Sequence, residues 1–547
     1  MRGLKNAGRS LTRSLALLIM LCVCVGHAGG QGAQGEYHNP VIAGDYPDPS
    51  VIRVGEDYWA TTTSGDWEPE FSLLHSRDLV NWETAGAVFQ TRPGWAARDF
   101  WAPEISQDRG RYFVYYTARK KSGPLCVAVA SADSPDGPYT DHGPLVCQRD
   151  GSIDASAATD ENGARYLLWK EDGNSRKQPT PIWAQKLSDD GTKLVGPKKE
   201  LIRNDVSWEG GVVEGPFILK RGEWFYLFYS GNACCGRRCN YALGVARSRK
   251  LLGPWEKNPK NPILAENETW QCPGHGSIVT DEAGRAFLLY HAYKRSETAF
   301  YIGREALLDE VKWGVDNWPS INEGRGPTGS APAPLGVARN ARGEDAIRDE
   351  FDTQALGPEW RWPQDSRPVM RLETERGGRL VLMPQENRAK DILGAVITRP
   401  TVSDKYVVTT AVDLNGMKAG AMAGLSAYAW NEDALGIIAG DGKVSVFVRE
   451  KKKQRMLAIA VPLSIAAMPR AASNVSDSNR AQLLYLRMTA QGGSQFRFAC
   501  SYDGRNWQTI GDEVNGSYLE PVSIALTAGG VSRAAATFEW FSLTPSH

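Results

Sequence analysis

Five copies of one short pattern, spread over residues 48 to 287, restrict this chain to a repeat architecture. Each copy joins a short strand pattern, a polar turn with Gly and a second strand rich in aromatic and branched residues, which is typical of a β-hairpin. The copies begin 53, 53, 60 and 61 residues apart, at Asp48, Trp101, Asp154, Glu214 and His275. Such self-similarity predicts a solenoid, a propeller or an array.

A third strand pattern follows most of these hairpins and selects among the repeat architectures. Runs of small and apolar residues end in a polar turn at residues 73–78, 127–132, 243–248 and 302–306. Units of roughly 40 to 60 residues made of strands alone are typical of propeller blades. No convincing amphipathic helix occurs in this region, which argues against an α/β barrel. The sequence therefore predicts an all-β chain with a five-bladed β-propeller over residues 37–327.

The blade arrangement predicts where the first residue of each repeat lies. The innermost strand of every blade lines the central channel, so corresponding residues of different blades converge there. Three carboxylates, the Trp101 indole and the His275 imidazole should therefore meet at one mouth of the channel. A single acid beside Pro or Gly is often only a turn residue, but three in matching positions favour a site. These three acids are Asp48, Asp154 and Glu214.

Three converging acids fit either a cation site or acid–base chemistry. Calcium prefers more oxygen ligands on local, flexible loops, whereas these acids stand on separate blades. Cleavage of a glycosidic bond needs one carboxylic acid to protonate the leaving oxygen and a second carboxylate to activate water. A third carboxylate would raise the pKa of the acid, because a neighbouring negative charge disfavours ionisation. Trp101 is placed to stack on a sugar ring.

Five motifs in this order resemble glycoside hydrolase family 43, whose members are five-bladed propellers that cleave arabinose- and xylose-containing polysaccharides with inversion. The resemblance implies that Asp48 is the general base and Glu214 the general acid, and that Asp154 orients Glu214 and tunes its pKa. It covers roughly residues 37 to 327. The motifs are Asn39-Pro-Val-Ile-Ala-Gly-Asp-Tyr-Pro-Asp48-Pro-Ser, Trp101-Ala-Pro-Glu, Ser152-Ile-Asp154, Val213-Glu214-Gly-Pro216 and Gly274-His275-Gly.

The resemblance also implies roles for residues of the last blade. Arg304 matches an arginine that contacts the sugar or the acidic cluster in relatives, and an arginine on a strand surface is the alternative. His275 matches an axial histidine that in many members helps to hold a cation or a water cluster. A structural calcium ion near His275 is therefore expected, although no cofactor is required. Ala155 departs from the family, which more often has Pro after the third acid.

The chain changes character after the last blade. Residues 328–346 are rich in Pro, Gly and Ala and are expected to form a linker. From residue 347 to 547, short alternating strands predict a β-sandwich. This region resembles the concanavalin-like sandwich of exo-acting β-xylosidases and arabinofuranosidases of the same family, with Asp349-Glu-Phe-Asp near its start. We expect it to support and shape the pocket of the propeller, with polysaccharide binding as the alternative.

The N-terminus predicts export. Four basic residues precede an apolar run of 11 residues, and small residues follow at 26 and 28, which indicates a secretory signal peptide over residues 1–28. An uncleaved anchor is the alternative, although this run is too short to span a bilayer. Cleavage leaves 59 basic against 63 acidic residues, a net charge of −4, which argues against a nucleic-acid partner. The protein is expected to be secreted or periplasmic, with no membrane contact after cleavage.

Nine cysteines become seven after removal of the signal peptide, and an oxidising compartment makes disulfides the expected state. The cluster Cys234-Cys235-Gly-Arg-Arg-Cys239 lacks a nearby His and a second spaced Cys pair, which argues against zinc. It is expected to be joined to itself or to Cys272. The odd number leaves at least one thiol free in a monomer.

These observations predict an exported inverting glycosidase that releases terminal arabinose or xylose from plant cell-wall arabinan, arabinoxylan or xylo-oligosaccharides. Tyr290-His-Ala-Tyr293 and Gly274-His275 resemble the arabinan-active branch of the family, whereas the sandwich resembles the exo-xylosidase branch, so both sugars are retained. One alternative is an endo-1,5-α-L-arabinanase, although relatives with such a sandwich tend to have a closed pocket. Another is a non-catalytic sugar-binding propeller, which would keep Trp101 but have no use for Glu214.

Overall fold

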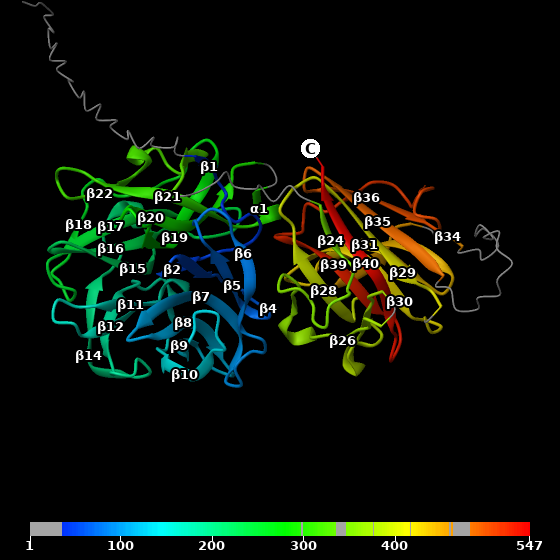
Figure 1. Ribbon diagram of the computed structural model, residues 1–547, viewed down its shortest axis with the longest axis horizontal. Helices are drawn as coiled ribbons and strands as arrows, with labels where there is room; N and C mark the ends of the chain where they lie inside the picture. Colours follow the sequence, from blue (N-terminus) through cyan, green and yellow to red (C-terminus); the bar gives the residue numbers. More distant parts are fainter. Residues whose placement is uncertain are drawn as a thin grey trace, which may run out of the picture.

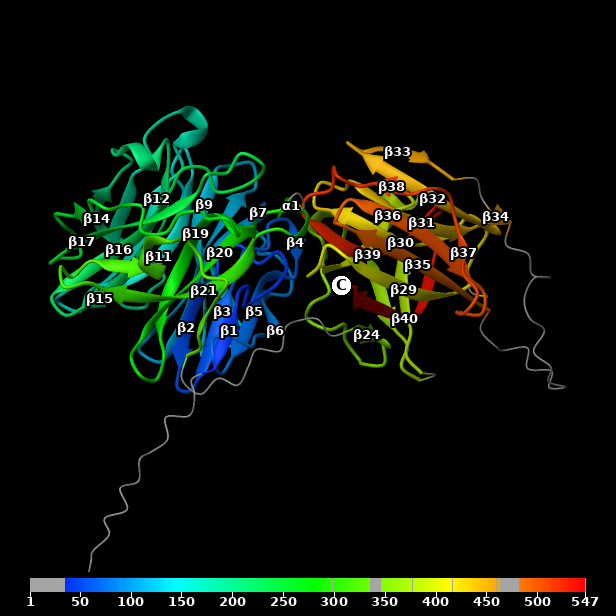
Figure 2. The same cartoon turned by 90° about the horizontal axis from the view of Figure 1, so that it is seen from above.

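The computed structural model describes residues 35–296, 299–334, 346–375, 377–415, 417–458, 461–462 and 482–546 (Figure 1). They form two β-rich bodies that lie side by side (Figures 1 and 2). The predicted signal peptide and residues 335–345 of the predicted linker lie outside the described residues. Among the described residues, none of the helices has the length and hydropathy that a membrane span requires.

Five four-stranded antiparallel sheets, here called blades 1 to 5, build the first half of the chain. Blades 1 and 2 contain β2 (Ser50–Val54), β3 (Asp57–Thr61), β5 (Glu70–Ser76), β6 (Glu83–Phe89), β7 (Ala96–Asp108), β8 (Arg111–Lys120), β9 (Leu125–Ala132) and β10 (Thr140–Val146). Blades 3 to 5 contain β11 (Ser152–Thr159), β12 (Arg165–Glu171), β13 (Ile182–Leu187), β14 (Leu194–Ile202), β15 (Val213–Arg221), β16 (Trp224–Gly231), β17 (Ala242–Ser248), β18 (Glu256–Lys257), β19 (Trp270–Thr280), β20 (Ala286–Lys294), β21 (Glu305–Trp313) and β22 (Pro319–Ile321).

The innermost strands of the blades close a ring. The strands β2, β7, β11, β15 and β19 contact one another in this order, and β19 also contacts β2. This is the predicted propeller, with the first strand of each repeat at its centre. A short pair outside the blades, β1 (Glu36–His38) and β23 (Ser330–Pro332), joins the two ends of this half of the chain. The first residues of the predicted linker therefore pair with the propeller.

Aromatic residues of the second strands fill the layers between neighbouring blades. In β8, Tyr116 packs edge-on against Phe71 of blade 1, with 5.3 Å between the ring centroids. Its neighbour Tyr115 points the opposite way and shares a buried cluster with Trp169 of blade 3. Both faces of β8 are buried, which explains why the central run of its sequence is continuously apolar instead of alternating between apolar and polar residues.

The last blade differs from the prediction at residues 302–306. Instead of a strand, Ile302 ends a short helix, α1 (Ala299–Ile302), and β21 begins only at Glu305. Gly303 between them has a φ of 104°, and a side chain there would collide with Asp45. This conformation suits glycine, and it turns the chain before the last strand pair. Other short helices are η1 (Asn174–Arg176), η2 (Ser207–Glu209), η3 (Asn322–Gly324), η4 (Gln364–Ser366) and η5 (Glu386–Arg388).

Two antiparallel sheets form the predicted sandwich in the second half. The first contains β24 (Ile347–Asp349), β26 (Val369–Leu372), β27 (Leu380–Met383), β29 (Tyr406–Asp413), β35 (Leu483–Gln491), β36 (Gln495–Ser501), β37 (Gln508–Thr509), β38 (Val514–Asn515) and β40 (Ala536–Pro545). The second contains β28 (Ala395–Pro400), β30 (Met422–Ala429), β31 (Ala434–Gly440), β32 (Lys443–Glu450), β33 (Lys453–Met456), β34 (Val461–Pro462) and β39 (Val522–Gly529). One continuous apolar cluster, which includes Trp360, Leu425 and Phe538, fills the space between them.

Main-chain pairing holds the sandwich against blade 1. The strand β25 (Trp362–Pro363) pairs with β4 (Trp67–Glu68), and the Trp362 indole donates a hydrogen bond to Glu68 at 3.1 Å. Beside it, the amide of Gln364 donates to the fully buried carboxyl of Glu70 at 2.9 Å. Because these contacts are buried and partly made by backbone, the sandwich has a defined position on the propeller.

Three disulfides and one buried free thiol account for the seven cysteines that follow the predicted signal peptide. Cys239 is joined to Cys272, and Cys234 is joined to Cys235, so both of the links that we expected as alternatives for this cluster are present. The third disulfide joins Cys126 to Cys147, and the free thiol is Cys500.

Replacing Trp360 by Ala should destabilise the sandwich. Its indole is 1% exposed and donates a hydrogen bond to Asp349, so the substitution removes packing and a buried hydrogen bond, at about 3–5 kcal/mol. The matched control is Trp430→Ala in the same domain, where the indole is 56% exposed and the expected change is within about 0.5 kcal/mol. Urea unfolding of both variants measures the difference, and equal losses would contradict the assigned core.

Candidate active site

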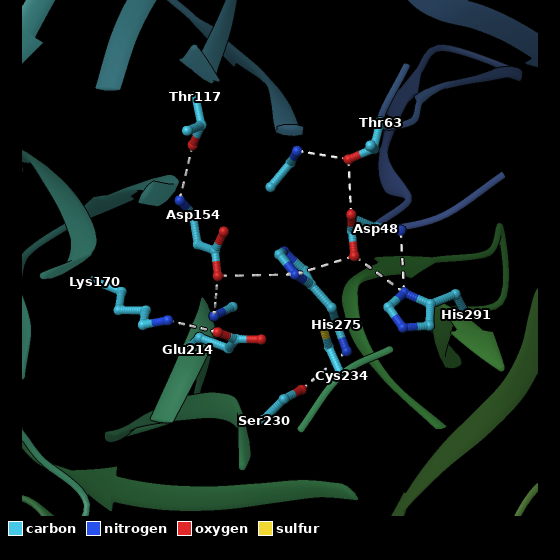
Figure 3. A network of polar contacts seen from close by, with 12 residues as sticks. Asp48, Thr63, Thr117, Asp154, Lys170, Glu214, Ser230, Cys234, His275 and His291 are labelled. Carbon is cyan, nitrogen blue, oxygen red and sulfur yellow. Dashed lines mark hydrogen bonds and ion pairs between the residues drawn. The ribbon is translucent and has the colours of Figure 1, made fainter. Parts of the chain in front are cut away.

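One cavity of about 750 Å³ lies where the innermost strands begin, and all six residues predicted for the site line it. They come from every blade, and Figure 3 shows how four of them face one another. The sandwich also lines this cavity, through Arg361, Trp430, Glu520 and Pro521. The six predicted residues are Asp48, Trp101, Asp154, Glu214, His275 and Arg304.

The backbone around this cavity repeats more regularly than the residue types do. Five residues, one per blade, have positive φ angles between 40° and 58°. We predicted that Trp101 and Glu214 correspond to Asp48, but the structure places them one residue before the equivalent position. Their side chains still line the cavity, because the next residue turns the backbone. The five equivalent residues are Asp48, Ala102, Asp154, Gly215 and His275.

A hydrogen bond from the preceding blade fixes four of these five turns. In each, a side chain near the end of the second strand accepts the N–H of the positive-φ residue. Positive φ is strained for residues other than glycine, and such bonds hold it in place. The pairs are Asp48 N–H to His291 Nδ1 (3.1 Å), Ala102 to Thr63 Oγ1 (2.7 Å), Asp154 to Thr117 Oγ1 (3.1 Å) and His275 to Ser230 Oγ (2.9 Å).

The Asp48 carboxylate is held in its ionised form. Thr63 Oγ1 donates to its Oδ2 at 2.7 Å, and Arg304 Nη1 donates to its Oδ1 at 3.1 Å. Burial by itself would raise the pKa of Asp48, but Arg304 above all, together with His275, outweighs burial and holds the pKa well below its ordinary value. Burial lowers the pKa of His291 to about 4, which keeps this ring neutral. Asp48 is thus a carboxylate able to accept a proton.

Glu214 lies between a cation and a hydroxyl. Lys170 Nζ is 2.7 Å from Oε2, and the Tyr241 hydroxyl donates to Oε1 at 2.9 Å. Burial alone would raise the pKa of Glu214, but Lys170 and, more weakly, other neighbours lower it. Burial raises the pKa of Asp154 to about 7, and the charge of Glu214 adds to this rise. Lys170 therefore acts against the effect that we expected from Asp154, since it lowers the pKa of Glu214 while Asp154 was expected to raise it.

His275 lies between two of the acids, Asp48 and Asp154. Its Nδ1 is 3.5 Å from Asp48 Oδ1 and 4.0 Å from Asp154 Oδ2. Within the described ranges, no group of three His, Cys, Asp or Glu side chains is arranged to hold a metal ion. Arg304 and Lys170 already bind carboxylates that a calcium ion would need. The site does not fit a directly bound calcium ion, and a water-mediated ion at His275 stays a prediction.

Several residues of the site were not found from the sequence. Lys170 had one usable signal, since it is a lone cation at the end of the buried apolar run 167–169. Tyr241 and Trp430 had none, because their positions depend on a loop and on the docking of the sandwich. Arg304, for which a surface position was the alternative, has a side chain only 17% exposed that contacts Asp48.

Comparison with known proteins agrees with both halves of the chain. The model of glycosyl hydrolases family 43 matches residues 37–319, and that of the beta-xylosidase C-terminal concanavalin A-like domain matches residues 348–544. Xylosidase/arabinosidase 43B of Humicola insolens is 29% identical over 440 residues, which are 76% of this chain and 79% of that protein. Xylan 1,3-beta-xylosidase of a Vibrio species is 29% identical over 423 residues, 71% of this chain and 76% of that protein.

Solved structures show the same similarity. The GH43 BlXynB protein of Bacillus licheniformis has 25% sequence identity to this chain and a TM-score of 0.79. The match covers 94% of this chain and 100% of that one, so it includes both the propeller and the sandwich.

Replacing Trp430 by Ala should weaken substrate binding more than folding. Its indole is exposed and lines the cavity, and an aromatic contact of this kind contributes about 0.5–1.5 kcal/mol, or roughly a 2- to 12-fold change in affinity. We expect KM for chromogenic glycosides to rise by that factor. The control Val369→Ala, exposed on β26 and outside the cavity, should leave KM unchanged. An unaltered KM in the Trp430 variant would contradict a contribution of the sandwich to substrate binding through this residue.

Proposed function

This chain belongs to glycosyl hydrolase family 43 and is a glycosidase, and from this premise we propose that it is an exported, inverting, exo-acting enzyme. Its substrates are arabinan, arabinoxylan or xylo-oligosaccharides, from which it releases terminal arabinose or xylose. Support for these two sugars comes from the xylosidase and arabinosidase names of the relatives.

The observation that carries the mechanism is the contrast between two carboxyl groups lining one cavity. Asp48 is ionised beside Arg304, as a general base that activates water must be. Glu214 stands on another blade, bonded through both carboxyl oxygens. In an inverting glycosidase such a pair acts from opposite faces of the sugar, with a water beside the base.

The proposed reaction breaks the glycosidic C–O bond in one displacement. Water attacks the anomeric carbon while Asp48 takes a proton from that water, and Glu214 donates a proton to the leaving oxygen. Burial raises the pKa of Asp154 to about 7, so the pair formed by Asp154 and Glu214 retains near neutral pH a proton that Glu214 can deliver to the leaving oxygen. The two acids therefore act as one proton-holding pair.

The sandwich residues that line one side of the cavity favour exo action, which is cleavage from the end of a chain. An endo-acting enzyme needs a cleft that a long chain can cross. Here the sandwich contributes four residues to the cavity, and Arg237 of the blade 4 loop pairs with Glu520 of the sandwich beside it. Such a wall suits a substrate that enters by one end. An endo-arabinanase is the alternative that substrate tests distinguish.

Export belongs to the same proposal. Its support is the signal-peptide pattern of residues 1–28 together with three disulfides, which persist in oxidising compartments and are rare in the cytosol.

The roles of the two carboxyls predict different substrate dependence for their variants. Glu214→Gln should lose roughly 100-fold or more in kcat on arabino- or xylo-oligosaccharides, and much less on 4-nitrophenyl glycosides, because 4-nitrophenolate leaves without protonation. Asp48→Asn should lose at least as much on both, because its water attacks either substrate.

Proton NMR of the first-formed sugar then gives the stereochemistry. Inversion of the anomeric configuration is the expected result, and retention would contradict the assignment of Asp48 as a base. Full activity of Glu214→Gln on oligosaccharides would contradict the assignment of Glu214 as the general acid. If the enzyme cuts debranched arabinan into long fragments rather than single sugars, the endo-arabinanase alternative is favoured.

Arg304 should determine the pH below which activity is lost, which is the acidic limb of the plot of kcat/KM against pH. In Arg304→Met the pKa of Asp48 rises, so activity that needs the ionised carboxylate is lost at a higher pH as the solution is acidified. We expect kcat/KM to fall roughly 10- to 150-fold, the loss of a charge-assisted hydrogen bond of about 1.5–3 kcal/mol. Arg304→Lys keeps the charge and should shift the limb less. An acidic limb unmoved in the Met variant would contradict this role.

A further inference from the structure

One blade breaks the hydrogen-bond pattern that fixes the turns around the cavity. Thr63, Thr117, Ser230 and His291 each stand near the end of a second strand and accept the N–H of the next blade's turn residue. In blade 3 the corresponding residue is Lys170, opposite Ile153, just as Ser230 is opposite Glu214 and Thr117 opposite Trp101. The equivalence follows from strand pairing and does not depend on residue type.

The exception has two consequences, because a lysine ammonium only donates hydrogen bonds. The N–H of Gly215, which has no acceptor at Lys170, donates instead to Asp154 Oδ2 at 3.0 Å. The ammonium itself binds Glu214 Oε2 at 2.7 Å and Asp172 Oδ1 at 2.9 Å. One departure from the repeat therefore connects Asp154 to the backbone next to Glu214 and a cation to the carboxyl of Glu214.

We propose that Lys170 is a positioning residue for the reaction, which holds the Glu214 carboxyl between its own ammonium and the Tyr241 hydroxyl. This inference rests on the proposed role of Glu214 as the acid. Lys170 reaches Glu214 and Asp172 from β12 and acts through them.

The fold does not require a cation in this position. Lys170 is only 1% exposed, and burying an ammonium is costly even when it is paired. Four blades close the same turn with a hydroxyl or a neutral imidazole, which bury at much lower cost. A threonine at residue 170 would resemble blades 1 and 2 and could accept the Gly215 N–H. The lysine is therefore explained by what it does to Glu214 and not by the architecture of the blade.

Lys170 also gives the acid a pH signature that other contacts would not produce. The charged and titratable groups around Glu214 and its bonding partners are Lys170 and Asp172 from blade 3, Asp154 from β11, His275 from β19, Tyr241 before β17 and Asp48 before β2. Of these, Lys170 is the cation that most lowers the pKa of Glu214. Removing it raises that pKa, so an acid catalyst would stay protonated to higher pH.

The test compares Lys170→Thr, Lys170→Met and Lys170→Arg with the wild type on arabino- and xylo-oligosaccharides. We expect the Thr variant to fold, with kcat reduced roughly 10- to 100-fold and KM changed by less than about threefold. The alkaline limb of its plot of kcat against pH should move to higher pH. The Met variant, which keeps the buried stem of the side chain, should show the same shift. The Arg variant keeps the cation and should retain the wild-type limb.

A matched control separates this role from that of an ordinary buried ion pair. Lys257 on β18 binds the fully buried Glu209 at 2.6 Å, outside the cavity. Lys257→Thr should lower the melting temperature and leave kcat and both pH limbs unchanged. If Lys170→Thr behaves in the same way, Lys170 is structural and the proposal is overturned.

Glu214→Gln, measured in parallel, separates the two proposals. An inactive Gln variant beside a folded Lys170→Thr or Lys170→Met enzyme with wild-type kcat and pH profile would overturn the role of Lys170 alone. A Gln variant with full activity on oligosaccharides would overturn the acid assignment and the Lys170 proposal with it.

Discussion

The whole site depends on one repeated hydrogen bond, from the N–H of a residue with positive φ to a side chain of the preceding blade. It fixes the point at which four of the five innermost strands turn into the cavity. Asp48, Asp154 and His275 occupy that turn directly, while Trp101 and Glu214 stand just before it. The bond always joins two blades, so the geometry of the acids is set by the closure of the ring rather than by any single blade.

The repeat pattern was enough to predict five blades and five cavity residues, because strand alternation and turn residues are local properties of the chain. The sixth, Arg304, was predicted only from the family resemblance. The pairing register was not local, and the offset of Glu214 from Asp48 followed only from strand pairing. Lys170 was overlooked because a single lysine after an apolar run is usually a strand end. Trp430 could not be placed at all, since its contact with the cavity depends on how two domains dock.

Charge balance distinguishes the two ends of the acidic cluster. Arg304 neutralises Asp48, and Lys170 neutralises Glu214, so each buried carboxylate has its own buried cation. For Asp154, burial outweighs the charges of His275 and Lys170 and raises the pKa to about 7. A nearby cation favours the ionised form of a buried acid, whereas burial by itself favours the neutral form. The three carboxyl groups of this cavity therefore differ in their affinity for a proton, as acid–base chemistry requires.

The strand pair between β4 and β25 joins two parts of the chain that contribute differently to the enzyme. The blades supply the residues for proton transfer, whereas loops of the sandwich supply part of the cavity wall, with Trp430 and Glu520 more than 200 residues after Glu214. Substitutions in those loops can alter which glycan end fits without disturbing a blade. New specificities are therefore accessible to this architecture through a domain that takes no part in the chemistry.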